Sequence, residues 1–113
     1  MVTGGAGFIG SHLVKRLLLE KYKVRVVDNF SSGKVQNIAP YLKHEKFELI
    51  KGDVRNRNTV REYLNGIDAV VHMAAMVSVE ESMKDPSETY KVNFIGTVNL
   101  VDEAIRRGVK RFI

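Results

Sequence analysis

The sequence contains no cysteine and no tryptophan, and only 2 of its 113 residues are proline. Without cysteine the chain has neither disulfides nor thiolate metal sites, a composition that favours a cytoplasmic protein. No apolar run approaches the roughly 20 residues that a membrane-spanning helix needs, so we expect no membrane partner. No signal-peptide pattern precedes the glycine-rich segment near the start of the chain.

The bulk composition is that of an ordinary globular domain, with 44% hydrophobic and 27% charged residues. The length predicts one domain over residues 1–113 with a core of its own. The formal net charge is +5, but the Lys and Arg residues are scattered along the chain. No helix-turn-helix, zinc-finger or RNA-binding signature accompanies them. We therefore interpret the positive charge as solvated surface and expect no nucleic-acid partner.

Three glycines at intervals of three, Gly4, Gly7 and Gly10, join a short apolar strand to a helical pattern over residues 8–20. In a dinucleotide-binding turn the first glycine allows a tight bend, and the second lets the backbone approach a pyrophosphate. The third allows close packing of the helix on the strand. The free N–H groups and positive dipole end of the helix would face the phosphates. An ordinary glycine-rich turn is the alternative, because the motif alone is weak evidence.

A second predicted strand, residues 23–28, supplies the missing context because it ends in Asp28, about 20 residues after the glycines. A carboxylate there can accept hydrogen bonds from both adenosine ribose hydroxyls and would repel a 2′-phosphate, which favours NAD over NADP. The alternative is a surface aspartate that ends a strand. Lys34 argues the other way, because a cation in this loop can tolerate a phosphate.

The remaining pattern predicts an α/β fold of the Rossmann type, a doubly wound parallel sheet that is incomplete, with about five strands in the order 3-2-1-4-5. Only three residues precede the glycines, so the first predicted strand is short, and the fifth stops with the chain. The near-continuous apolar run of the fourth strand predicts burial on both faces. The other predicted elements are strands over 47–51, 69–75 and from 109, and a short helix over 58–65 capped by Asn58.

A long helix is predicted over residues 86–107, with Asp85 as its cap, Glu88 completing a capping box, and Gly108 as its stop. Its predicted inward side consists of Val92, Ile95, Val98, Asn99, Ala104 and Ile105.

Three titratable residues have competing interpretations. Asp53 follows the third strand and either lies beside an adenine or caps the next helix, and the sequence leaves both open. His72 alternates within a buried strand, which favours a satisfied core histidine over a catalytic one. No second metal-ligating residue lies four positions after His12, so we interpret His12 as a structural or surface histidine and expect no metal site.

Five blocks, in order and at family spacing, resemble an extended short-chain dehydrogenase/reductase. The resemblance is strongest to the NAD-dependent nucleotide-sugar epimerases and dehydratases, with UDP-glucose 4-epimerase as type member. It covers nearly the whole chain, and five blocks are far more specific than the glycines alone. The blocks are Thr3 to His12, Val27 to Asn29, Gly52 to Arg55, His72 to Ala75, and Asn93 to Thr97.

The resemblance implies NAD as cofactor and assigns a role to each matching position. The implied contacts are Gly4, Gly7 and Gly10 in the turn; Phe8 and Ile9, through backbone N–H, on the pyrophosphate; Asp28, Asn29, Ser32 and Gly33 on the adenosine ribose and its phosphate; Asp53 and Val54 at the adenine; Met73, Ala74 and Ala75 along the nicotinamide-side ribose; and Asn93 in support of that end.

The family's catalytic Tyr-x-x-x-Lys pair has no counterpart in these residues, because none of the 4 tyrosines is followed by lysine at the fourth position. We therefore predict no catalytic residue here and no turnover by this chain alone. The resemblance implies a nucleotide-sugar substrate in full-length relatives and a homodimer through the helix over 86–107. The alternatives are a non-catalytic NAD-binding module and a folded fragment that acts only within an oligomer.

Overall fold

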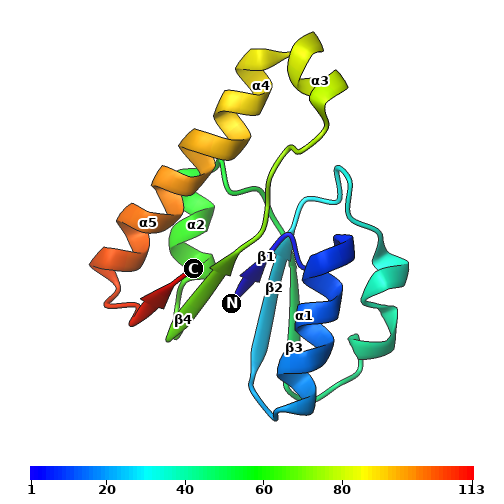
Figure 1. The fold of residues 1–113 in the computed structure, drawn as a ribbon. Coiled ribbons are helices and arrows are strands. Elements are labelled where there is room, and N and C mark those ends of the chain that lie inside the picture. Colours follow the sequence, from blue (N-terminus) through cyan, green and yellow to red (C-terminus); the bar gives the residue numbers. More distant parts are fainter.

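The computed structural model describes residues 1–113 and contains one parallel sheet of five strands in the order β3-β2-β1-β4-β5 (Figure 1). This confirms the predicted Rossmann-type fold and strand order. The strands are β1 (Val2–Thr3), β2 (Val24–Asp28), β3 (Phe47–Lys51), β4 (Ala69–His72) and β5 (Arg111–Phe112).

Helices connect the strands and cover both faces of the sheet (Figure 1). They are α1 (Phe8–Leu19), the 3-10 turns η1 (Val35–Asn37) and η2 (Ala39–Tyr41), α2 (Arg57–Tyr63), α3 (Val79–Lys84), α4 (Pro86–Tyr90), the π-helical turn η3 (Lys91–Ile95), and α5 (Gly96–Arg106). No helix of the structure is both long enough and apolar enough to span a membrane.

The alternation of side chains along β2 divides the interior into two clusters. Val26 packs on the α1 side with Val14 and Leu18, whereas its neighbour Val27 packs on the opposite side. Both valines are at most 1% exposed. Because successive residues of a strand point to opposite faces, one strand serves both layers.

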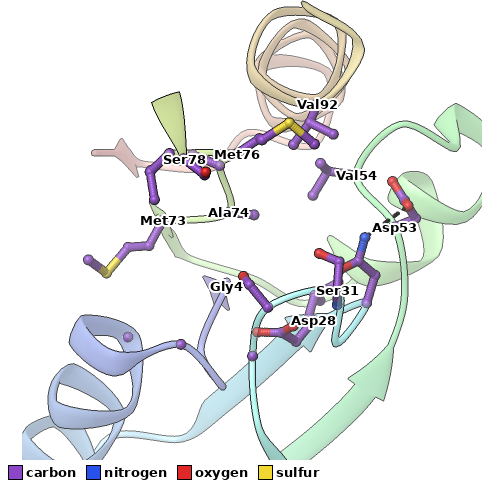
Figure 2. A pocket seen from close by; sticks show the side chains of 18 of the residues that line it. Gly4, Asp28, Ser31, Asp53, Val54, Met73, Ala74, Met76, Ser78 and Val92 are labelled. Carbon is purple, nitrogen blue, oxygen red and sulfur yellow. Dashed lines mark hydrogen bonds between the residues drawn. The ribbon is translucent and has the colours of Figure 1, made fainter. Parts of the chain in front are cut away.

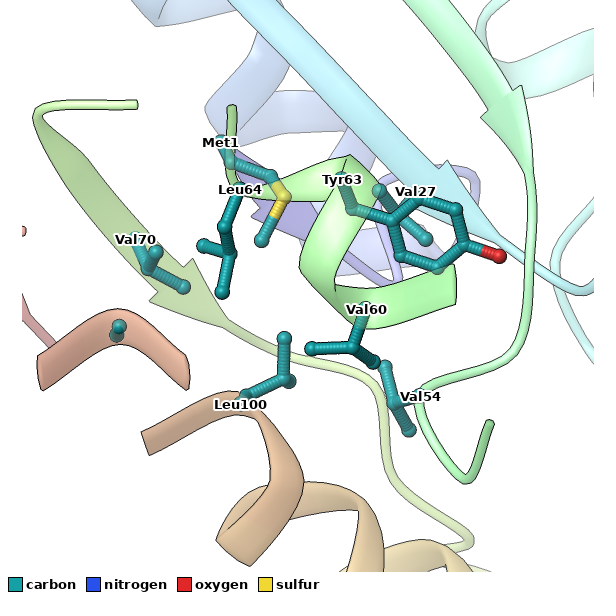
Figure 3. Packing of buried hydrophobic residues seen from close by; sticks show 9 residues of the cluster. Met1, Val27, Val54, Val60, Tyr63, Leu64, Val70 and Leu100 are labelled. Atoms are coloured by element: carbon teal, nitrogen blue, oxygen red, sulfur yellow. The ribbon is translucent and has the colours of Figure 1, made fainter. Parts of the chain in front are cut away.

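The cluster on the α2 and α5 side is the larger one (Figure 3). Val60 and Leu64 of the α2 region meet Leu100 of α5 and Val70 of β4 there, and all four are at most 1% exposed. Burying a side chain of this size contributes about 1.5–3 kcal/mol. Gly96 lets α5 approach closely, since a Cβ there would lie 2.5 Å from Cγ2 of Val54.

Some predicted boundaries are wrong in detail. The cap of α2 is Asn56, whose Oδ1 accepts from the N–H of Asn58 at 3.2 Å, so Asn58 itself is not the cap. β4 ends at His72 rather than at residue 75: the Met73 amide is shared between the carbonyl and the hydroxyl of Thr3, and the Ala74 amide bonds to the Thr3 hydroxyl. Burial of β4 on both faces is also only partly correct, since Ala69 is exposed while Val70 is completely buried.

The predicted long helix is present but is divided by the π turn η3 into α4 and α5. Asp85 caps it as predicted, with Oδ1 accepting from the N–H of Glu88 at 2.9 Å. The Glu88 carboxylate does not complete a capping box, because it pairs with Arg55 instead. Two residues predicted to face inward, Val98 and Ile105, are 43% and 74% exposed.

Candidate cofactor-binding site

A cavity of about 710 Å³ opens at the carboxyl ends of the strands. The strand order reverses between β1 and β4, and open α/β sheets bind their ligands at such a switch point. Figure 2 shows Gly4, Asp28, Val54, Ala74 and Val92 around one open space. Segments that follow four different strands therefore meet at a single site.

The glycine turn leaves no room for side chains at two of its positions. Gly4 has a φ of +65°, and a Cβ there would lie 2.8 Å from backbone atoms of Met73 and Ala74. A Cβ at Gly10 would overlap the carbonyl oxygen of Gly4. Only glycine combines the positive φ with this close approach of β1, α1 and the loop after β4.

The N-terminus of α1 faces the cavity without a side-chain cap. Gly7 is the cap residue, and the first turn contains no acidic side chain. The amides of Phe8, Ile9 and Gly10 have no partner four residues earlier within the helix. These residues line the cavity, so their N–H groups and the positive dipole end of α1 suit a phosphate group.

Asp28, at the end of β2, is only 7% exposed, so its interpretation as a surface residue is wrong. Its Oδ2 accepts from the N–H of Ala6 at 2.9 Å, and its Oδ1 accepts from the N–H of Phe30 at 2.9 Å. A Cβ at Gly33 would lie 2.8 Å from Oδ1, so glycine lets this loop pass over the carboxylate. A carboxylate has about four acceptor sites, which leaves two on Asp28 for a ligand.

Asp53, after β3, also lines the cavity but is held differently. Its Oδ1 accepts from the backbone N–H of Arg55 and from Nε of Arg55, both at 2.9 Å. Its Oδ2 accepts from Nη2 of Arg55 at 2.5 Å and from Nδ2 of Asn29 at 3.1 Å. Asp53 does not cap α2, so the helix-cap interpretation is wrong.

The Arg55 guanidinium joins the loop after β3 to α4, because its Nη1 also pairs with Glu88 of α4. Hydrogen bonding from Arg55 lowers the pKa of the Asp53 carboxyl from 3.8 to about 2, although burial opposes this shift. The two carboxylates in turn raise the pKa of Arg55. The sequence placed Arg55 within a family block but did not indicate this ion pair.

A directed chain of hydrogen bonds joins β1, β4 and α5 beneath the cavity. Thr3 Oγ1 accepts from the N–H of Met73 at 3.1 Å and of Ala74 at 3.2 Å, so its own hydrogen points to His72 Nδ1, 2.7 Å away. The Thr97 hydroxyl donates to the carbonyl of Asn93 at 2.6 Å, which leaves it to accept from His72 Nε2 at 2.9 Å.

His72 is therefore the neutral Nε2–H tautomer, an assignment that follows from the roles of the two hydroxyls. Burial lowers the pKa of His72, which also favours the neutral ring. His72 is thus a satisfied interior histidine, as the sequence predicted, and it does not line the cavity.

Asn93 supports the cavity from behind. Its Oδ1 accepts from the N–H of Met76 at 2.8 Å, and its Nδ2 donates to the Met76 carbonyl at 2.9 Å. Met76 lines the cavity but Asn93 itself does not. Asn93 therefore holds the loop after β4 by two hydrogen bonds, and its support of the nicotinamide-side end remains a prediction.

The structure brings all the other predicted cofactor residues together at the cavity wall. They are Gly4, Gly7, Phe8, Ile9, Gly10, Asp28, Asn29, Ser32, Gly33, Asp53, Val54, Met73, Ala74 and Ala75. Their contacts with NAD remain a prediction.

The cavity is also lined by residues that were not predicted as site residues, most of them in the segment that follows β4. They are Val27, Ser31, Gly52, Met76, Val77, Ser78, Glu81, Lys84, Asp85 and Val92. Several lie on or beside α3, which was not predicted. The signal was present, because Ser78 and Glu81 have capping-box spacing, and Ser78 Oγ accepts from the N–H of Glu81 at 3.2 Å. No three His, Cys, Asp or Glu side chains gather in a way that suits a metal ion.

A parallel doubly wound sheet whose glycine turn and buried carboxylate meet at the switch point defines a nucleotide-binding α/β protein of the Rossmann type. Comparison with known proteins specifies the family. The chain belongs to the NAD dependent epimerase/dehydratase family, whose model matches residues 1–113.

Relatives with different reactions match this chain about equally well. UDP-glucuronic acid decarboxylase 1 of Danio rerio is 40% identical over 110 residues, which are 97% of this chain and 25% of that protein. UDP-glucose 4-epimerase of Rhizobium meliloti is 40% identical over 119 residues, covering 100% of this chain and 33% of that protein. The chain thus spans a quarter to a third of the length of these relatives.

Among solved structures, the dTDP-glucose 4,6-dehydratase DesIV from Streptomyces venezuelae, in a complex with NAD, superposes with a TM-score of 0.92 and 37% identity. The superposition covers 98% of this chain and 37% of the dehydratase chain.

Proposed function

We propose that this chain is the NAD-binding portion of an enzyme that epimerises, dehydrates or decarboxylates a nucleotide sugar. Asp28 is the observation that carries the proposal, because it is 7% exposed, lines the cavity and keeps two acceptor sites free. Two free sites match the two hydroxyls of a ribose. The negative charge of Asp28 disfavours a 2′-phosphate, so the cofactor is NAD rather than NADP.

The chain's own residues bind and orient the dinucleotide. The uncapped first turn of α1 holds the pyrophosphate, and Asp28 holds the adenosine ribose at the adjacent strand end. Met73 and Ala74, whose amides are fixed by Thr3 Oγ1, line the nicotinamide side. When bound, NAD supplies the hydride acceptor for oxidation of a sugar carbon.

The type of reaction is proposed to depend on residues outside this chain. A decarboxylase and an epimerase are each 40% identical to it, which indicates that the matched region is common to several reactions. None of its 4 tyrosines has lysine at the fourth following position, so we expect no turnover from these residues alone.

We further propose that α4 and α5 form a dimer interface. The surface consists of Tyr90 of α4, Phe94 of η3, and Val98 and Ile105 of α5, which follow one another at sequence intervals of four and seven and are 43–74% exposed. The rings of Tyr90 and Phe94 stack with centroids 5.1 Å apart. An apolar stripe of this kind is typical of a helix that packs on a second helix.

Isothermal titration calorimetry tests the cofactor proposal. We expect NAD to bind, NADP to bind at least tenfold more weakly, and Asp28→Ala to weaken NAD binding by about tenfold or more through loss of the ribose contacts. Asp68→Ala is the matched control, because the Asp68 side chain is 83% exposed and lies outside the cavity. Absence of NAD binding, or equal binding of NAD and NADP, would contradict the proposal.

A further inference from the structure

The backbone of Ala6, in the middle of the glycine turn, is held by residues that lie outside the turn. Ala6 is completely buried, and its N–H donates to Oδ2 of Asp28 at 2.9 Å. Its carbonyl oxygen accepts from the backbone N–H of Lys34 at 3.0 Å and from Nδ2 of Asn37 at 2.7 Å. A backbone carbonyl has two lone pairs, so the segment after β2 supplies a donor for each of them.

The Ala6 carbonyl shares one planar peptide group with the N–H of Gly7. That N–H donates to the carbonyl of Gly4 at 3.1 Å. Gly7 is the residue from which α1 starts, and it lines the cavity. The hydrogen bonds at both ends of this peptide therefore fix the plane that sets the position of the first turn of α1, whose free amides face the cavity.

Asn37 holds this peptide from a position behind the cavity wall. It ends η1, where its own N–H donates to the carbonyl of Lys34 at 3.0 Å, and the next residue, Ile38, is completely buried. Asn37 is not among the residues that line the cavity. Lys34 donates through its backbone, whereas Asn37 donates through its side chain, so a substitution of Asn37 removes the bond without changing the cavity wall itself.

Resting on the proposed function, we infer that Asn37 is a positioning residue for the pyrophosphate site. Its side-chain amide keeps the Ala6–Gly7 peptide, and with it the first turn of α1, in the orientation that receives the phosphates. Donors that are already oriented bind a ligand without the cost of ordering them first. No local motif pointed to Asn37, because its bond to Ala6 spans 31 residues.

Asn37→Ala tests the inference by removing the donor to the Ala6 carbonyl. We expect NAD to bind about three- to tenfold more weakly, the range that corresponds to one hydrogen bond. Adenosine has no pyrophosphate and still meets Asp28, so its affinity should fall by less than about twofold. Calorimetry measures the NAD affinity, and titration followed by nuclear magnetic resonance measures the weaker adenosine affinity. A role limited to overall stability would not make the two losses differ.

Two further variants complete the experiment. Asn37→Leu keeps the side-chain volume but has no donor, so it should repeat the result of Asn37→Ala. Asn58→Ala is the matched control, because Asn58 lies on α2 outside the cavity. This control should keep both affinities within about twofold of the wild type. Circular dichroism checks that all three variants are folded.

The outcomes separate the two proposals. If the wild type binds NAD and both Asn37 variants bind it within about twofold of the wild type, the positioning role is wrong and the proposed function stands. Equal losses for NAD and adenosine also overturn the role, because Asn37 would then support the ribose side rather than the pyrophosphate turn. If the wild type binds no NAD, the proposed function fails and the inference falls with it.

Discussion

At the scale of single residues, the two cavity carboxylates differ in their hydrogen-bonding partners although both are aspartates. Asp28 and Asp53 follow neighbouring strands, β2 and β3, and line the same cavity. Two backbone amides hold Asp28, whereas a guanidinium and an amide side chain hold Asp53. Asp28 thus has fewer protein partners than Asp53, whose pairing with Arg55 ties the loop after β3 to α4.

The Asp53 pairing predicts a specific acid sensitivity. The pKa of Asp53 is about 2 in the folded chain, against 3.8 for the free group. A carboxyl whose folded pKa lies below its unfolded value stabilises the fold fully above pH ~4, and this contribution is lost as the pH falls toward ~2. Its size is about 1–2 kcal/mol, since the 28% exposed side chain is partly screened.

Urea unfolding across pH measures this contribution. We expect the difference in unfolding free energy between wild type and Asp53→Asn to be constant above pH ~5 and to shrink between pH ~4 and ~2. Asp68→Asn, at an exposed position, serves as the control. A difference that stays constant down to pH ~2 would show that the Arg55 pairing does not stabilise the folded chain.

At the scale of elements, the hydrogen-bond chain through His72 ties β1 and β4 to α5. It involves Thr3, whose side chain is completely buried, and Thr97, on the first turn of α5. The amides of Met73 and Ala74, which line the cavity, both bond to the Thr3 hydroxyl, so this chain of hydrogen bonds holds part of the cavity wall. The strand ends and the helix are expected to shift together.

Thr97→Val tests this coupling by removing the acceptor of His72 Nε2–H while keeping the side-chain volume. We expect a loss of about 1–3 kcal/mol in unfolding free energy, because a partly buried donor is left without a partner. Thr97→Ser should recover most of the loss. Thr59→Val, whose exposed hydroxyl bonds only to the Asn56 carbonyl, is the control. Equal losses in the two valine variants would contradict the coupling.

At the scale of the whole molecule, the exposed stripe on α4 and α5 predicts self-association. Phe94, in the middle of the stripe, is 53% exposed and stacks on Tyr90. Sedimentation velocity at rising concentration should show a dimer for the wild type and a monomer for Phe94→Glu, because a charge in an apolar interface is costly. Lys110→Gln makes the same change in net charge, −1, away from the stripe and should leave the dimer intact. A wild-type monomer at high concentration would exclude this interface.

The sequence predicted most of the fold because its signals are local. The valines of the second strand, Val24, Val26 and Val27, lie close together in the chain, and so do the three glycines of the turn. The predicted inward side of the long helix is only partly correct. Asn99 and Ala104 are 7% and 4% exposed, as predicted, whereas Val98 and Ile105 lie on the exposed side.

The sequence by itself determined the alternation of strands and helices, the glycine turn and the positions of the cavity aspartates along the chain, because periodicity and backbone sterics act over a few residues. Only the tertiary structure decided which groups form hydrogen bonds with each cavity carboxylate. The Arg55–Glu88 pair spans 33 residues and the Thr3–His72 bond spans 69. Such contacts arise from the way strands and helices pack, and no local spacing rule encodes them.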